Sequence, residues 1–195
     1  MQKDKRGPPG KLRIVAGSLR GSKLAVPDRP GLRPTSDRVR ETLFNWLMPV
    51  IEGARCLDLY AGTGALGIEA ISRGAAACTF VESDRALARE LRENLARLKV
   101  DHARVIEGDA LAALAGRSEP FDIVFLDPPF GGDLWTASAE RLESGGWLSA
   151  SAWIYVEAPA QAALALPVTW MLHRESQAGA VHFALYRRSA ADPVK

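Results

Sequence analysis

A glycine-rich turn between an apolar run and a helix-like run constrains this chain more than any other feature. Gly62, Gly64 and Gly67 have the spacing Gly-x-Gly-x-x-Gly and directly follow an apolar run at 56–60. Glycine lets the backbone turn tightly and approach a ligand closely, and the helix that follows offers unpaired N–H groups to an anion. The turn either binds such a ligand or serves only to pack a strand against a helix.

Strand-like and helix-like runs alternate after this turn, which implies parallel strands joined by right-handed crossovers. Two further apolar runs near the end flank Gln177, Ala178 and Gly179 and predict a closing hairpin. The expected fold class is α/β: a Rossmann-like, mostly parallel sheet that ends in an antiparallel hairpin. Strands are expected at 56–60, 77–82, 103–106, 121–126, 153–157, 168–174 and 181–187, and helices at 66–72, 84–98, 111–114 and 134–142.

The first fifty residues form a separate unit in this prediction. Runs at 12–16 and 23–26 predict a β-hairpin, and 28–34 reads as a loop. Thr35 or Ser36 then caps a helix that Pro49 closes. We therefore expect four segments: a flexible basic tail at 1–10, a hairpin and helix at 11–50, the main domain at 51–190, and a short tail at 191–195.

The charge of the chain is uneven. Residues 1–40 hold eleven Lys and Arg against three Asp and Glu, while the rest of the chain holds fourteen against twenty. This distribution favours either a polyanionic partner or a solubilising tail. Most of the early basic residues are Arg, whose planar fork suits phosphate oxygens.

Several classes of protein are not expected. No run approaches the roughly 18 apolar residues of a membrane span, and the start of the chain lacks a secretory signal. Cys56 and Cys78 lie in apolar runs and read as reduced core residues, as in a cytoplasmic protein. His102, His173 and His182 lack metal-ligand spacing, so no metal site is expected.

Acidic residues lie in or after the expected strands. Glu82 comes 20 residues after Gly62, the offset at which an acid accepts from ribose hydroxyls, unless it is only an exposed strand-end charge. Asp109 either accepts from an adenine amine or caps the short helix after it. Asp58 lies inside an apolar strand and needs a partner, which the amides of the glycine turn or a cationic ligand can supply.

A stiff acidic loop follows the strand expected at 121–126. It consists of Asp127, Pro128, Pro129 and Phe130. The prolines can hold a carboxylate and a carbonyl close together as acceptors, and an aromatic ring can stack on a planar base. This set matches the exocyclic amine of a nucleobase. The alternative is a proline-rich turn with Phe130 in the core.

Taken in order, these motifs resemble those of class I S-adenosylmethionine-dependent N-methyltransferases. More narrowly, segments 13–17, 33–46 and 58–64 resemble the RsmD family, whose members methylate the exocyclic N2 of one guanine in 16S ribosomal RNA. The resemblance covers about residues 11–188. It implies S-adenosyl-L-methionine as cofactor, and 16S ribosomal RNA or the assembling small subunit as partner. We also expect a monomer, with no membrane partner.

The resemblance also implies residue roles. Asp127 through Phe130 would hold the target base, and Arg38 would face the mouth of the active site. Asp84 either competes with Glu82 for the ribose or caps its helix. Cofactor contacts are implied for Asp58, Ala61, Gly62, Thr63, Gly64, Glu82, Asp109, Ala110, Thr35 and Arg38.

Three alternatives stay open at this point. The Asp127 loop does not distinguish guanine from adenine, so an adenine-N6 methyltransferase acting on DNA or RNA is one. An NAD-dependent oxidoreductase would use the glycine turn and Glu82, but it has no use for the Asp127 loop. A non-catalytic RNA-binding protein with a decayed cofactor site is the third.

Overall fold

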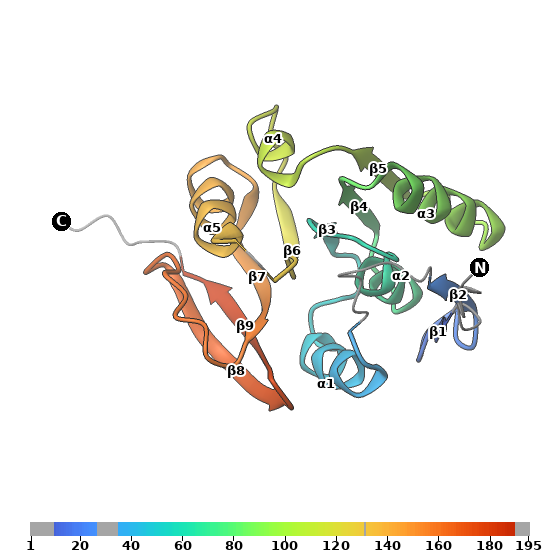
Figure 1. The fold of residues 1–195 in the computed structure, drawn as a ribbon, viewed down its shortest axis with the longest axis horizontal. Helices are drawn as coiled ribbons and strands as arrows, with labels where there is room; N and C mark the ends of the chain where they lie inside the picture. The colour runs from blue at the N-terminus through green and yellow to red at the C-terminus, as the bar shows by residue number, and fades with distance from the viewer. Residues whose placement is uncertain (1–9, 27–34, 131, 190–195) are drawn as a thin grey trace, which may run out of the picture.

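The computed structural model describes residues 10–26, 35–130 and 132–189 (Figure 1). Residues 1–9 of the tail expected at 1–10, the tail expected at 191–195 and the loop expected at 28–34 lie outside the described residues, while Gly10 already belongs to the first strand. The hairpin pairs β1 (Gly10–Arg13) with β2 (Lys23–Val26) in antiparallel register. No helix in the described ranges is both long and apolar enough to cross a membrane.

Seven further strands form one sheet, and five helices pack on it. The strands are β3 (Arg55–Asp58), β4 (Ala77–Glu82), β5 (Ala103–Glu107), β6 (Phe121–Leu126), β7 (Leu148–Pro159), β8 (Trp170–Ala178) and β9 (Val181–Arg188). The helices are α1 (Asp37–Leu47), α2 (Ala65–Ser72), α3 (Arg85–Arg97), α4 (Ala110–Leu114) and α5 (Leu134–Ser144).

The strand order of the sheet is β5-β4-β3-β6-β7-β9-β8. Strands β3 to β7 pair in parallel, and β9 lies antiparallel between β7 and β8. The predicted α/β sheet with a closing hairpin is therefore confirmed. The register of the β8–β9 pair shifts between Leu172 and Arg174, which marks a bulge in the edge strand β8.

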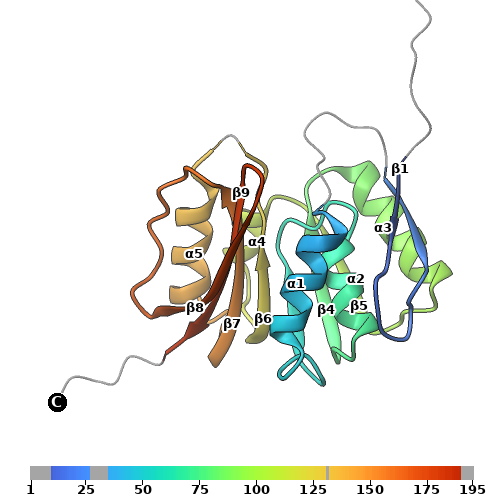
Figure 2. The ribbon, with the colours of Figure 1, turned by 90° about the horizontal axis from the view of Figure 1, so that it is seen from below.

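The core has two layers of buried apolar side chains, one on each face of the sheet. Helices α1, α2 and α3 cover one face, and α4 and α5 cover the other (Figure 2). Ser36 begins α1 by accepting a hydrogen bond from the N–H of Val39 at 3.3 Å, so Ser36 and not Thr35 is the cap. Cys56 and Cys78 are buried free thiols, as predicted.

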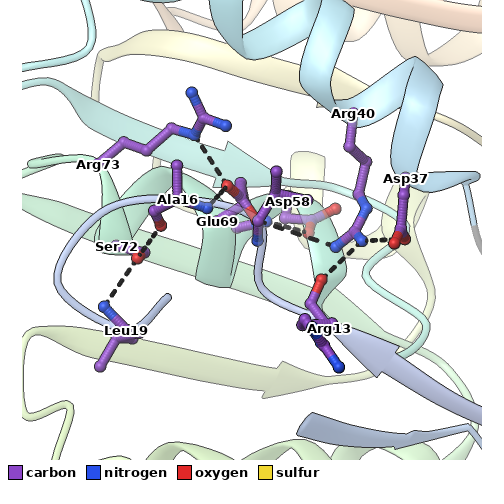
Figure 3. A network of polar contacts seen from close by, with 11 residues as sticks. Arg13, Ala16, Leu19, Asp37, Arg40, Asp58, Glu69, Ser72 and Arg73 are labelled. Carbon is purple, nitrogen blue, oxygen red and sulfur yellow. Dashed lines mark hydrogen bonds and ion pairs between the residues drawn. The ribbon is translucent and has the colours of Figure 1, made fainter. Parts of the chain in front are cut away.

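A buried carboxylate joins the N-terminal segment to the sheet domain (Figure 3). The Glu69 side chain of α2 has no exposed surface and accepts hydrogen bonds from Val15 N at 2.8 Å, Ala16 N at 3.0 Å and Arg73 Nε at 2.8 Å. The first expected strand, 12–16, therefore ends early. β1 stops at Arg13; Ile14 N still donates to Ser22 O across the hairpin, but the amides of Val15 and Ala16 bind Glu69 and not a partner strand.

Arg40 completes this Glu69 network from α1. Its guanidinium donates to Asp37 Oδ1 at 2.6 Å and to the carbonyl of Arg13 at 2.8 Å, and Nη1 lies 3.9 Å from Glu69 Oε2. Arg40 is fully buried, so this member of the basic segment is structural and does not face a polyanion. Gly17 is equally constrained, because its φ is +83° and a Cβ there would lie 1.7 Å from the carbonyl oxygen of Ser72.

We predict that Glu69→Gln lowers the free energy of unfolding by about 3 kcal/mol, because it removes a negative charge that balances the buried positive charge of Arg40. Urea denaturation measures the change. Glu119→Gln is the matched control: it breaks an exposed 2.6 Å pair with Arg55 and should cost less than about 1 kcal/mol. Equal losses in the two variants would contradict the structural role of Glu69.

Candidate active site

The glycine turn lies where the order of the parallel strands reverses. Strand β3 has β4 on one side and β6 on the other, and ligands of open α/β sheets bind at the carboxyl ends of strands at such a point. Gly62 and Gly64 take positive φ values of 54° and 77°, and Gly64 begins α2. Side chains other than glycine rarely adopt these angles, so the turn depends on both residues.

Glu82 at the end of β4 holds the turn from the side. Its Oε2 accepts from Gly62 N at 2.7 Å, and its Oε1 accepts from Asp84 N at 2.7 Å. Burial raises the pKa of Glu82, and the hydrogen bonds from Asp84 and Gly62 lower it in part. The alternative of an exposed strand-end charge is wrong, because Glu82 is only 9% exposed.

Asp58 ends β3 on the other side of the turn. It is buried, and its Oδ2 accepts from Gly67 N at 3.0 Å. Burial raises the pKa of Asp58 to about 7; the Gly67 hydrogen bond lowers it, and the charge of Glu82 raises it further. The amide of the glycine turn is therefore a partner of Asp58, as one alternative predicted.

Two other acids cap helices. Asp84 Oδ1 accepts from Ala86 N at 2.8 Å and Leu87 N at 3.1 Å at the start of α3. Asp109 Oδ1 accepts from Ala112 N at 2.8 Å at the start of α4. Both capping alternatives are confirmed.

The Asp127 loop follows β6, the neighbour of β3. Asp58 is in register with Phe125, so Asp127 lies two residues beyond the pairing, beside the start of the glycine turn. Asp127 is partly exposed and Pro128 is buried, whereas Pro129 is exposed. Phe130 is 48% exposed, with its ring 6.1 Å from that of Trp135. The alternative that places Phe130 in the core is therefore wrong.

Sequence reasoning missed Glu157, near the end of β7. Leu126 is in register with Val156, which places Asp127 and Glu157 side by side on adjacent strands. Glu157 is 7% exposed. Its position, an acid at the end of an apolar strand, is the same signal that singled out Asp58 and Glu82.

Thr35 and Tyr155 complete the cluster around these two acids. Glu157 Oε2 accepts from the hydroxyl of Tyr155 at 2.7 Å and from that of Thr35 at 3.3 Å. Removal from water, followed by the charges of Glu157 and Asp58, raises the pKa of Asp127 well above its usual value, and a hydrogen bond from Thr35 lowers it. Thr35 therefore belongs to the Asp127 side of the site.

The remaining predicted residues lie around the same edge. Arg38 is exposed on the first turn of α1, three positions after Thr35. Ala61, Thr63 and Ala110 are buried. In the described part of the chain, no three His, Cys, Asp or Glu side chains gather in a way that could hold a metal ion. Cofactor contact by these residues stays a prediction.

Comparison with known proteins identifies the class. A solved structure described as the putative methyltransferase yhhF from Escherichia coli matches with a TM-score of 0.87 and 50% identity, over 93% of this chain and 99% of that one. The sheet order, the glycine turn and the Asp127 loop thus define a Rossmann-like methyltransferase.

Sequence relatives identify the family. Ribosomal RNA small subunit methyltransferase D of Escherichia coli K12 is 52% identical over 97% of this chain and 96% of its own length. The protein of that name from Haemophilus influenzae is 46% identical over 91% of this chain and 94% of its own length. The family described as conserved hypothetical protein 95 matches residues 12–187, and the chain belongs to this family. The predicted RsmD resemblance is confirmed, and the NAD-dependent alternative is excluded.

Proposed function

We propose that this chain transfers a methyl group from S-adenosylmethionine to the exocyclic N2 amine of a guanine in 16S ribosomal RNA. The observation that carries the proposal is the position of Asp127, beside the glycine turn at the point where the strand order reverses. Similarity to proteins named ribosomal RNA small subunit methyltransferase D supports the choice of RNA. The family resemblance supports guanine over adenine.

The residues at the carboxyl edge fit this cofactor. Asp58, Glu82, Asp109 and Asp127 end or follow four adjacent strands. Burial, and after it the charge of Glu82, raises the pKa of Asp58. An edge with this excess of negative charge favours a cationic ligand. Glu82 and Asp109 offer acceptors for ribose hydroxyls and an adenine amine. When bound, the cofactor supplies an electrophilic methyl group on a sulfonium.

The chain itself positions the amine. The Asp127 carboxylate and the Pro128 carbonyl accept hydrogen bonds from the two N–H groups, which directs the nitrogen lone pair toward the methyl group. Phe130 stacks on the base. Such positioning is worth about 7–11 kcal/mol of the barrier, and the charge of Asp127 stabilises the positive charge that develops on the nitrogen.

The basic N-terminal segment fits the RNA side of this proposal. Arg13, Arg20 and Arg38 are exposed or partly exposed, and Arg–phosphate contacts offset the cost of unstacking a base, a few kcal/mol. Binding of RNA should therefore weaken steeply with salt. We infer that this segment docks the RNA, while the sheet domain performs the transfer.

Methylation of small subunits from cells lacking this protein tests the proposal. The purified chain, small subunits or naked 16S RNA, and isotopically labelled cofactor are combined, and labelled nucleotides are mapped by mass. We expect label on N2 of a single guanine. Label on an adenine would establish the adenine-N6 alternative, and absence of label from both substrates would refute the proposal.

The role of Asp127 predicts a selective loss of turnover. Asp127→Ala should lower kcat by at least about 100-fold, because a preorganised charge is lost, while the dissociation constant of the cofactor changes less than about twofold. Asp122→Asn is the control at the other end of β6, where the carboxylate accepts from Arg55 N. Its turnover should match the parent chain. Unchanged turnover of Asp127→Ala would remove Asp127 from the mechanism.

The raised pKa of Asp58, about 7, predicts that cofactor binding depends on pH. Below pH 7 the free protein carries a proton on Asp58, and a nearby cation favours the ionised form, so binding releases that proton. The dissociation constant should therefore fall as pH rises toward 7, by at most about tenfold per pH unit, and level off above it.

Calorimetry in two buffers of different ionisation enthalpy measures both the affinity and the proton release. Asp58→Asn keeps the shape of the side chain and should flatten the dependence. A slope that persists in this variant would assign the titration to another group.

A further inference from the structure

The pairing of Asp127 with Glu157 goes beyond the proposed reaction. Strands β6 and β7 are parallel neighbours, with Leu126 in register with Val156. Neighbouring strands lie about 4.8 Å apart. Leu126 and Val156 both pack in the core layer of α4 and α5. Because side chains alternate along a strand, the two carboxyl groups project together on the other face.

Three surrounding groups hold Glu157 in place. The hydroxyl groups of Tyr155 and Thr35 donate to its carboxylate, and the indole of Trp135 donates to its backbone carbonyl at 2.8 Å. Thr35 lies 122 residues away in the sequence. Contacts from its own strand, from α5 and from Thr35 ahead of α1 thus hold Glu157, whose carboxylate the transfer mechanism does not yet use.

The charged groups that act on Asp127 are acidic. They are Glu157 from β7 and Asp58 from β3. Tyr155 is the other titratable group beside the pair, and its pKa is itself raised well above the usual value by burial and by the charges of Glu157 and Asp127. The other close neighbours, Thr35 and Trp135, do not titrate. Two adjacent carboxyl groups in such a setting do not both ionise at neutral pH.

We propose that Glu157 is a positioning residue for methyl transfer, and that it holds one proton in common with Asp127. The Thr35 hydroxyl contacts both side chains; with its one hydrogen it donates to the ionised carboxylate and accepts from the protonated one. This inference rests on the proposed function. When the cationic cofactor and the amine bind, the pair gives up that proton to water, and ionised Asp127 accepts the amine N–H groups.

The same pair receives the proton that the reaction releases. The nitrogen lone pair forms the new N–C bond, and the electrons of the broken C–S bond remain on sulfur. One N–H bond of the methylated amine then breaks, and its proton passes to the Asp127 carboxylate. That proton restores the singly protonated pair of the free protein, so the reaction consumes no other reactant.

The pH profile of a single methylation turnover tests this role. Activity requires ionised Asp127, so the rate falls on the acidic side as Asp127 binds its proton. Glu157→Gln removes the neighbouring charge and keeps the shape, so the acidic limb should move down by at least about one pH unit. Thr35→Val removes a hydrogen bond that lowers the pKa of Asp127, so the acidic limb of this variant should move to higher pH.

These opposite shifts separate positioning from simple structural damage. A damaged site would lose rate by the same factor at every pH with the limb unmoved, and that result would overturn the proposal. If Glu157→Gln fails to fold, an acidic limb that does not shift in Thr35→Val would also overturn the proposal. Glu175→Gln, an exposed carboxylate on β8, is the control and should leave the profile unchanged.

A second readout does not depend on the substrate. The infrared absorption of protonated carboxyl groups, titrated in the free protein, should lose its highest-pH component both in Glu157→Gln and in Asp127→Asn. Retention of that component in both variants would refute the shared proton. Because no RNA is present, this result stands whether or not the chain methylates 16S RNA.

Discussion

The buried carboxylate of Glu69 is the interaction on which the arrangement of the whole chain depends. It binds two amides of the N-terminal segment and Arg73 of its own helix, with Arg40 from α1 close by. The helix that carries Glu69 begins at the glycine turn. The segment that docks RNA in our proposal and the turn that holds the cofactor are therefore attached to the same eight-residue helix.

A second regularity is the use of acids at the ends of buried strands. Asp58 and Glu82 end β3 and β4, Asp127 follows β6, and Glu157 lies near the end of β7. Removal from water raises the pKa of Asp58, Glu82 and Asp127, and the Tyr155 hydroxyl donates to Glu157. The first two shape the glycine turn. The other two form the pair beside the proposed substrate, so one structural device serves both halves of the reaction.

The sequence predicted what local signals determine. The strand at 77–82 is correct at both ends, as is the strand at 121–126, which the Asp127 loop terminates. The sequence could not predict contacts that depend on how distant segments pair in the folded chain. β7 extends back to Leu148 through a Ser- and Ala-rich stretch with no strand signal, and Glu157 joins the site only through the register with β6. Arg40 looked like a basic surface residue because burial depends on Glu69, far along the chain.

The bulge in β8 has a consequence for the solubility of the fold. β8 is an outer strand, and it exposes Met171 and Leu172. A straight outer strand with apolar side chains is a template for strand addition from another molecule, and a bulge interrupts the regular row of backbone donors and acceptors. The irregularity between Leu172 and Arg174 thus lies beside the two residues that would otherwise promote aggregation.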